Sequence, residues 1–194
     1  MKKQIALYFL ILMASLVSFG CDNSTEPEPP ATGQTITSDF DVMVEGKTVN
    51  GCGLGIDDAA ESRDWMQNDA DSMSLEYPGV LAWASVFITV GDPKPENRPW
   101  FDISACTNLA IEMKGEVGGE KVLIGIKDKV DPDNGLETKK SATLTKDWNV
   151  YEFKLSDFFT CDLKNVYVIA EFVFPAGSKK EATTVHIKNI RILK

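Results

Sequence analysis

Aromatic and charged side chains alternate with aliphatic ones along several short segments of this chain. In residues 81–90, Trp83 falls on the opposite side of an extended strand from Val86 and Ile88. The corresponding side of the other segments carries Glu112, Lys127, Tyr167 and Glu171. Flat aromatic rings stack on the C–H faces of pyranose rings, and planar polar groups hydrogen-bond sugar hydroxyls. On one sheet, these five residues predict a face for a neutral glycan; the alternative is an ordinary solvent-facing side with cross-strand pairs.

Two further tryptophans lie outside this pattern. Trp65 stands in a long polar stretch, and Trp100 follows Asn-Arg-Pro at the entry to a strand. A tryptophan with few apolar neighbours in the sequence has little to pack against, so both are candidate exposed platforms for sugar. Trp148, at a polar corner before Tyr151, is expected to be structural.

The residue types give little support to catalysis. His186 is the only histidine and lies in a strand-like segment, which argues against a triad that uses histidine. A glycosidase needs two carboxyl groups across a cleft, one of them with a raised pKa, and no such pair stands out. A polysaccharide lyase with Lys127 and Tyr167 as base and acid is the enzyme alternative.

The elements that must position these residues are short strand-like segments between Trp100 and Leu193. They are rich in Val, Ile, Tyr, Phe and Thr and are separated by Gly, Pro, Asp and Asn, which is typical of an antiparallel β-sandwich. We expect an all-β jelly roll of about eight to ten strands. The clearest strands are predicted at residues 109–114, 121–127, 138–145, 150–155 and 166–174.

Three local signals add detail. Asn134-Gly135 predicts a tight hairpin turn, because both residues tolerate positive φ. The apolar phase of the last strand changes between Ile187 and Ile190, which predicts a β-bulge near Lys188-Asn189. Residues 46–73 are rich in glycine and acids, so a long functional or mobile loop is expected there.

Several of these strand and corner motifs resemble a known group. Over about residues 74–194, WFDIS, LAIEMKG, GIKD before DPDNG, TLTKDWNVYEFKLSDF and VHIKNIRIL resemble galactose-binding-like jelly rolls that serve as carbohydrate-binding modules of bacterial polysaccharide-degrading systems. The resemblance implies two antiparallel sheets, an aromatic-bearing sugar site and often a structural calcium. Lys188 stands where many relatives carry an acidic calcium ligand, which leaves Asp39 and Asp41 as candidate ligands.

The N-terminal residues predict secretion and lipidation. A basic start and an apolar run have the pattern of a signal peptide, and Ser18 to Cys21 resembles the lipobox in which the cysteine of bacterial lipoproteins is acylated. Secretory cleavage near Gly20 is the alternative. We therefore expect a signal peptide at residues 1–20, a disordered acidic and proline-rich tether at 21–34, and one jelly-roll domain at 35–194. The lipid would attach the protein to the bacterial outer membrane or cell surface.

Charge and cysteine content limit the partners and cross-links. The formal net charge of −9 at pH 7 repels a phosphate backbone, so nucleic acid is not expected as a partner. With Cys21 acylated, Cys52, Cys106 and Cys161 remain, which allows one disulfide at most in a monomer. An up-and-down strand order puts Cys106 and Cys161 at one end of the sandwich and predicts a bond between them; three free thiols are the alternative.

Together these patterns favour a monomeric, non-catalytic lipoprotein that binds a polysaccharide or oligosaccharide and assists its capture or degradation at the cell envelope. A structural or protein-binding envelope lipoprotein of the same fold is the alternative. A polysaccharide lyase or hydrolase is the further alternative.

Overall fold

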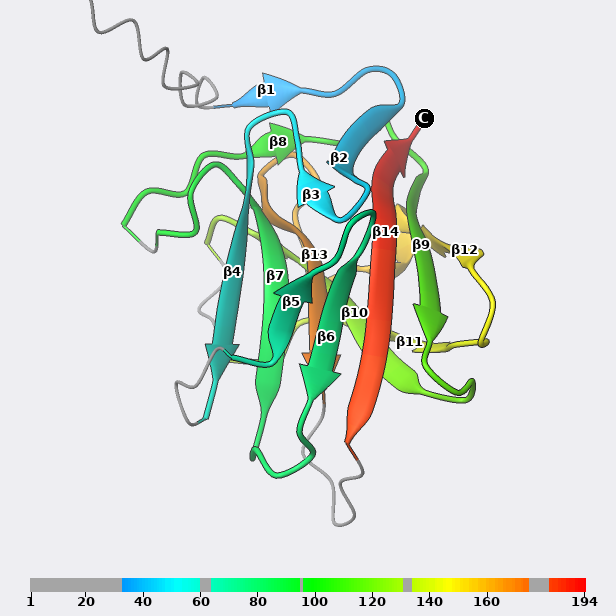
Figure 1. Ribbon diagram of the computed structural model, residues 1–194. Helices are drawn as coiled ribbons and strands as arrows, with labels where there is room; N and C mark the ends of the chain where they lie inside the picture. Colours follow the sequence, from blue (N-terminus) through cyan, green and yellow to red (C-terminus); the bar gives the residue numbers. More distant parts are fainter. Residues whose placement is uncertain (1–32, 60–63, 95, 131–133, 175–181) are drawn as a thin grey trace, which may run out of the picture.

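The protein is a sandwich of two β-sheets (Figure 1). The computed structural model describes residues 33–59, 64–94, 96–130, 134–174 and 182–194. Sheet A consists of β1 (Gln34–Thr35), β4 (Cys52–Asp58), β7 (Ala84–Val90), β8 (Phe101–Asp102), β10 (Lys121–Asp128), β11 (Lys139–Thr143) and β13 (Val166–Phe174). Sheet B consists of β2 (Phe40–Val44), β3 (Lys47–Thr48), β5 (Met66–Asn68), β6 (Met73–Tyr77), β9 (Asn108–Gly115), β12 (Asn149–Lys154) and β14 (Thr183–Leu193). The all-β sandwich predicted from the sequence is confirmed.

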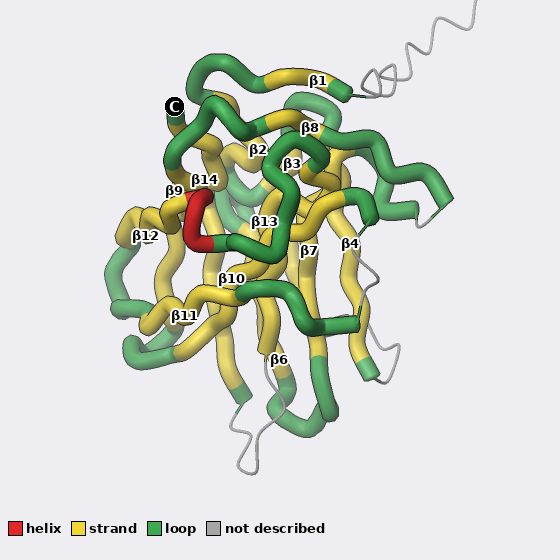
Figure 2. Tube along the Cα trace, turned by 180° about the vertical axis from the view of Figure 1, so that it is seen from behind, coloured by secondary structure: helices red, strands yellow, loops and turns green. Residues whose placement is uncertain are grey.

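The central part of sheet A is an antiparallel array in the order β4-β7-β13-β10-β11. The short strands β8 and β1 extend the sheet at one end of β13. In sheet B the long strand β14 pairs with β9 on one side and with β6 and β2 on the other. The single-turn 3-10 helix η1 (Leu155–Asp157) begins the connection from β12 in sheet B to β13 in sheet A. Figure 2 views the sandwich from the sheet A side.

The core lies between the sheets and is built by strand alternation. Val86, Ile88 and Phe172 of sheet A and Ile111 and Ile187 of sheet B are fully buried. Each such side chain contributes about 1.5–3 kcal/mol through removal from water. The opposite parity of the sheet A strands faces outward and forms the surface on which the candidate site lies.

Trp65 belongs to this core. Its ring packs edge-on against Tyr77 and Phe174, at centroid distances of 6.2 and 5.8 Å. Its indole N–H donates to Oδ2 of the buried Asp58 at 2.9 Å, so the polar atoms of both side chains are satisfied. Only 4% of Trp65 is exposed, and the prediction that it is an exposed platform is wrong.

The strand predictions agree with the structure except where glycine obscured the pattern. Strands at 109–114, 121–127, 138–145, 150–155 and 166–174 correspond to β9, β10, β11, β12 and β13. The bulge near Lys188-Asn189 is confirmed by a register shift between Ile187 and Asn189. The loop predicted at 46–73 is wrong, because β4 and β5 lie within it. Gly53 and Gly55 gave β4 a weak strand signal, yet β4 pairs along its length with β7.

The connection between β10 and β11 is longer than predicted. The two strands are antiparallel neighbours, but they end and begin at Asp128 and Lys139, too far apart for a tight hairpin. Gly135 adopts a positive φ of 73°, and the Asn134 side chain instead accepts a hydrogen bond from the Leu136 amide. This wider connection becomes one wall of the candidate site.

β13 contains an irregularity that matters for its outward-facing side. Its pairing with β7 steps from Val168–Thr89 to Ala170–Ile88, so β13 holds one more residue than its partner at this point. The register with β10 shifts at the same level. This is a β-bulge, and it changes the alternation of side chains along the strand.

The cysteine and N-terminal predictions have different outcomes. The predicted Cys106–Cys161 disulfide is wrong, since none of Cys52, Cys106 and Cys161 takes part in a disulfide. The Cys106 thiol is buried and lies 3.6 Å from the Ile36 carbonyl oxygen. Cys21 and the signal peptide lie outside the described residues, within which no helix is long and apolar enough to cross a membrane.

Candidate functional site

A cleft of about 640 Å³ opens on the outer face of sheet A. Its floor is formed by β4, β7, β13 and β10, and its walls come from the segment between β7 and β8 and the segment between β10 and β11. Its size is that of a typical small-molecule site. The side chains on which its chemistry depends are Asp57, Trp83, Phe87, Arg98, Lys127, Glu137, Lys139, Tyr167 and Glu171.

The floor follows from the strand register. Direct cross-strand partners align one residue from each of five neighbouring strands, in the order Gly55, Phe87, Glu171, Gly125 and Lys139. The two glycines make the hollow. A Cβ atom on Gly55 would stand 2.2 Å from the Phe87 ring, and one on Gly125 would stand 3.0 Å from Glu171 Oε2. The missing side chains therefore leave room for an aromatic ring and for a carboxyl group.

An aromatic surface lies at the β7 side of the cleft. Trp83 immediately precedes β7 and is 44% exposed, which is unusual for so large an apolar side chain. Phe87, four residues further on, lies half-buried in the floor over Gly55. Asp57 and Ser85 are opposite each other in the neighbouring strands and supply polar groups beside the rings. Flat apolar rings flanked by hydrogen-bonding groups are suited to a sugar ring.

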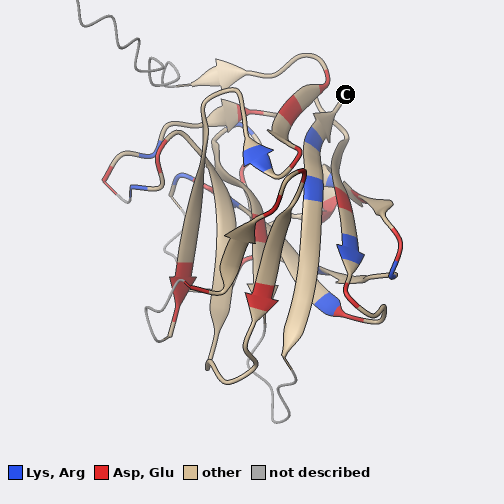
Figure 3. Ribbon diagram, viewed as in Figure 1, with Lys and Arg blue, Asp and Glu red and all other residues tan. Residues whose placement is uncertain are grey.

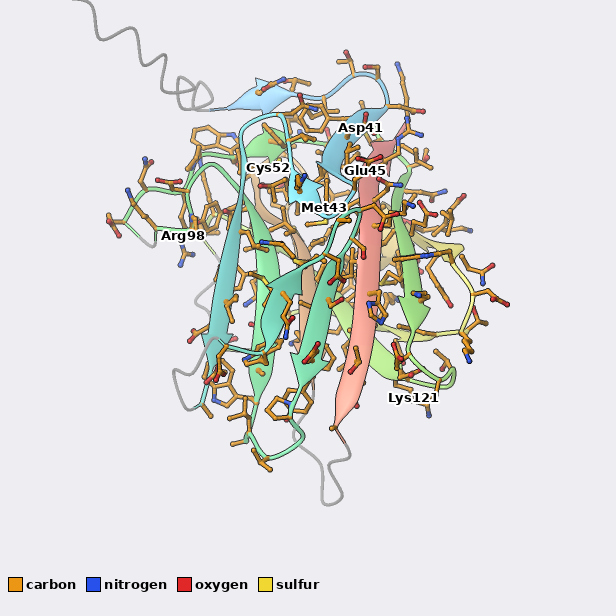
Figure 4. The ribbon with its side chains drawn as sticks, viewed as in Figure 1. Asp41, Met43, Glu45, Cys52, Arg98 and Lys121 are labelled. Atoms are coloured by element: carbon orange, nitrogen blue, oxygen red, sulfur yellow. The ribbon has the colours of Figure 1, made fainter. Side chains whose placement is uncertain are left out.

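Tyr167 connects the floor to the wall between β7 and β8. Its ring is nearly buried, and its hydroxyl faces the carbonyl oxygens of Asp92 and Lys94 at 3.5 and 3.4 Å. The Arg98 guanidinium lies 5.4 Å from the centre of the ring, in cation–π contact. Arg98 extends from this segment at the margin of the sandwich (Figure 4). Tyr167 therefore positions the wall as well as lining the cleft.

Four charged side chains meet at the β10–β11 side of the floor. Lys127 Nζ is 3.5 Å from Glu171 Oε1 and 3.7 Å from Glu137 Oε1, and Lys139 also pairs with Glu137. The Glu137 side chain is 1% exposed and that of Glu171 is 7% exposed. Charges so far from water are costly unless they are paired, and here each carboxyl faces at least one ammonium group.

The two carboxyl groups of this cluster have opposite pKa shifts. Burial raises the pKa of Glu171 to about 7; Lys127 opposes this rise, and the neighbouring Glu137 carboxyl adds to it. Burial acts in the same direction on Glu137, but Lys139, Glu171, the backbone and Lys127 together lower its pKa to about 2. The two carboxyl groups influence each other, so below about pH 7 Glu171 carries a proton while the neighbouring Glu137 is ionised.

Four of the seven residues predicted as ligand-binding meet in the cleft: Trp83, Lys127, Tyr167 and Glu171. The other three do not line it. Glu112 lies on β9 in sheet B, where it accepts a hydrogen bond from the Asn189 side chain at 2.6 Å. Trp65 is in the core, and Trp100 packs under Lys129, whose ammonium group is 3.3 Å from the ring centre. The four residues that line the cleft share one face of sheet A, and Glu112 does not belong to it. Trp65 and Trp100 do not belong to it either.

Sequence reasoning did not assign Asp57, Phe87, Arg98, Glu137 or Lys139 to the site. Phe87 shares its strand parity with Trp83, so alternation could have found it. Asp57 follows the same rule once β4 is recognised as a strand. Arg98 and Glu137 lie on connecting segments, where no periodic signal exists.

The predicted calcium ligands have a different environment from the one expected. Arg191 Nε is 2.7 Å from Asp41 Oδ1, and Arg191 Nη2 is 3.8 Å from Asp39 Oδ2. Lys188, at the position of the expected acidic ligand, pairs with Asp71 at 2.9 Å. In the described part of the chain no three metal-binding side chains form a group. These carboxylates are already paired with a side-chain cation, so they do not fit calcium. Calcium binding stays a prediction without structural support.

The sandwich is that of a carbohydrate-binding module. Residues 18–194 match the sequence profile of carbohydrate binding domain 30 (CBM30). The chain belongs to this family, and the resemblance proposed from the sequence is confirmed. No curated protein is significantly similar to the chain.

Solved structures agree with this fold. A family 30 carbohydrate-binding module is 22% identical, with a TM-score of 0.52, over 80% of this chain and 87% of its own. The family 30 module of a cellulosomal cellulase of Clostridium thermocellum is 21% identical, with a TM-score of 0.53, over 80% and 98% of the two chains. A family 29 module in complex with mannohexaose is 13% identical, with a TM-score of 0.54, over 80% and 90%. At such identities the likeness concerns the fold.

Proposed function

We propose that this protein binds a neutral polysaccharide or oligosaccharide in the cleft on sheet A and does not cleave it. The observation that carries the proposal is Trp83, a large ring left 44% exposed at the edge of a cleft that also holds Phe87 and a cluster of polar groups. Family membership supports the class of ligand. The rings would stack on sugar faces, while Asp57, Arg98 and the floor charges would bond hydroxyl groups.

The charge balance of the cleft supports a neutral ligand. Its lining has three acidic residues, Asp57, Glu137 and Glu171, and three basic ones, Arg98, Lys127 and Lys139. These charges largely compensate one another, and several are already engaged in ion pairs. With Glu171 protonated the lining has one positive charge in excess at most, which is too little to favour a charged polymer strongly.

The geometry of the polar groups supports binding without cleavage. Glycosidases separate their two carboxyl groups by about 5–9.5 Å to accommodate a sugar carbon or a water. Glu137 and Glu171 instead share one ion-pair partner, Lys127, at 3.7 and 3.5 Å. The lyase alternative fares no better, because Lys127 is paired with both carboxyl groups and the Tyr167 hydroxyl faces backbone carbonyls.

The location and biological role are also part of the proposal. Acylation of Cys21 would anchor the domain in the outer membrane or at the cell surface through the acidic tether, where it would assist capture or degradation of a polysaccharide. Radiolabelled lipid incorporation, lost in Cys21→Ala, tests the anchor. An unlabelled wild-type protein would overturn it.

Isothermal titration with cellohexaose and mannohexaose tests the binding function. The first probe is chosen because a similar family 30 module belongs to a cellulase, and the second because a similar family 29 module was solved with it. We expect binding of at least one probe and a loss of at least about tenfold in affinity for Trp83→Ala, the scale of an aromatic hot spot. Trp148→Ala removes a half-buried tryptophan from the other sheet and should bind like wild type. Absence of binding to both probes, or equal affinity of Trp83→Ala and wild type, contradicts the proposal.

A further inference from the structure

The segment 134–139 forms the β10–β11 wall of the cleft and is held mainly by polar contacts. Asn134, Gly135, Glu137 and Lys139 line the cleft. The Thr138 amide donates to the Thr160 hydroxyl at 2.8 Å, and the Lys139 ammonium group donates to the Gly135 carbonyl at 3.1 Å. Leu136 is 79% exposed, so this segment has little apolar anchorage to the sheet.

Glu137 is the buried anchor of this wall. Its side chain is 1% exposed and points onto the floor, where it meets Lys127 of β10 at 3.7 Å, Lys139 of β11 and the Glu171 carboxyl group. The glycine at position 125 makes this possible, since a Cβ there would stand 3.7 Å from Glu137 Cγ and 3.0 Å from Glu171 Oε2. The position of the Glu137 side chain on the floor therefore depends on the balance of these charges.

The charged groups that face Glu171 are few and can be named by element. Lys127 comes from β10, Glu137 from the wall segment and Lys139 from β11, while β7 on the other side presents the apolar Phe87. Arg98 and Asp57 are the other charged groups of the cleft. Two carboxylates in contact repel each other strongly in a site of this burial, and one proton between them converts that repulsion into a hydrogen bond.

We propose that Glu137 is a positioning residue of the cleft, which holds segment 134–139 in place as a wall only while the facing Glu171 carboxyl group carries a proton. When Glu171 releases its proton to solvent, the contact between the two carboxyl groups becomes repulsive and Lys127 is shared between two carboxylates, so Glu137 is held less tightly and the wall leaves the floor. Since burial raises the pKa of Glu171 to about 7, the wall is seated at pH 6 and released at pH 8. The consequence for ligand affinity rests on the proposed glycan-binding function, whereas the position of the wall does not.

The first test is titration of the wild-type protein with cellohexaose and mannohexaose at pH 6 and pH 8. If the protonated form alone has a complete cleft, affinity falls about tenfold between these values, in proportion to the competent fraction. Glu171→Gln places an amide donor opposite Glu137 and should show the same affinity at pH 6 and at pH 8. Glu137→Gln should bind weakly at both. Glu152→Gln, an acid-to-amide change on β12, is the control that keeps the wild-type pH profile.

The second test does not need a ligand. Hydrogen exchange of a peptide covering residues 134–139, corrected for the intrinsic pH dependence of exchange, should show lower protection at pH 8 than at pH 6 in wild type. It should show full protection at both pH values in Glu171→Gln and low protection at both in Glu137→Gln. Equal corrected protection of this peptide at the two pH values in wild type would overturn the proposal. If exchange follows the prediction but neither sugar binds, the wall mechanism stands and the proposed function fails.

Discussion

The outer faces of the two sheets carry similar side chains but differ in what those side chains contact. On sheet B, Trp148 is half-buried beneath two ammonium groups, those of Lys114 and Lys188, at 5.2 and 5.7 Å from the ring. His186 lies edge-on to the same ring and pairs with Glu116 at 2.9 Å. Charged residues of sheet B occur on β14 and β9 and also on β2, β3 and β6 (Figure 3). On sheet A, by contrast, Trp83 remains open beside a cleft.

Aromatic and charged residues therefore do not make a site unless the sheet leaves space beside them. Sheet B fills the positions around Trp148 with long side chains that pair with one another. Sheet A places Gly55 and Gly125 in the row that contains Phe87 and Glu171, and so leaves a hollow. On this fold, the ability of a sheet to bind a ligand thus depends on glycines, which leave space, as much as on the side chains that are present.

The variant expected to change stability most is one of Trp65, whose ring lies in the core between the two sheets. Trp65→Ala should lower the free energy of unfolding by about 3–5 kcal/mol, because it opens a cavity beside Tyr77 and Phe174 and removes the indole hydrogen bond to buried Asp58. Trp83→Ala should change it by less than about 0.5 kcal/mol, as expected for a surface position. Urea unfolding measures both. Equal destabilisation by the two variants would contradict the contrast between a core and a cleft tryptophan.

Filling the hollow should make sheet A behave like sheet B. Gly55→Ala places a Cβ atom 2.2 Å from the Phe87 ring, which must move. We expect a loss of about 1–3 kcal/mol in unfolding free energy, the usual cost of overpacking, together with weaker sugar binding. Ser141→Ala on exposed β11 is the control in thermal unfolding and titration. If Gly55→Ala binds sugar and unfolds as wild type does, the glycine is not what keeps the hollow open.

The charged floor should give sheet A a dependence of stability on pH. A raised carboxyl pKa in the folded state means that stability from Glu171 is present below about pH 4.5 and is lost as pH rises through about 7. The lowered pKa of Glu137 has the opposite sign, and its contribution is lost as pH falls from about 4.5 towards 2. Between pH 5 and pH 8 wild type should lose on the order of 1–2 kcal/mol. Urea unfolding of Glu171→Gln should show a flatter profile; a profile parallel to wild type would refute this assignment.

The smallest effect is expected from the ion pairs of sheet B. Lys188→Met removes the partner of Asp71, an exposed pair of the kind that is worth little in water. Thermal unfolding should change by little more than the error of the measurement, and sugar affinity should be unchanged. A clear loss of sugar binding in this variant would show that the sheet B face also takes part in recognition.

The parts of the site that the sequence predicts are those that strand alternation controls. Trp83, Lys127 and Glu171 were assigned to one face because parity is a local property of a strand. Glu112 was placed on the same face wrongly, because the sheet that β9 joins is decided by its pairing with β14 and β12, far away in the sequence. The alternation of residues within a strand therefore does not determine which sheet of the sandwich the strand joins.

The remaining differences have equally specific causes. Trp65 has polar neighbours in the sequence, and its burial depends on Phe174 from a distant strand. Glu137 is in a connecting segment without periodicity, and its contact with Glu171 depends on a long-range fold of that segment. The fold could be predicted because strands and turns carry local signals, whereas the walls of the cleft arise from contacts that link separate elements.

The extra residue in β13 has a consequence for how such a face can be remodelled. Glu171 lies on one side of the bulge at Ile169, while Tyr167 and Val168 lie on the other, and all three line the cleft. Val168 pairs with Thr89 and Glu171 with Phe87, so the bulge lets two residues that are three apart on β13 face the same side. Loss of Ile169 would leave these pairs in place, so β13 can change length at this position without reversing the floor, whereas loss of a residue from a regular part of the strand would reverse the side chains beyond it.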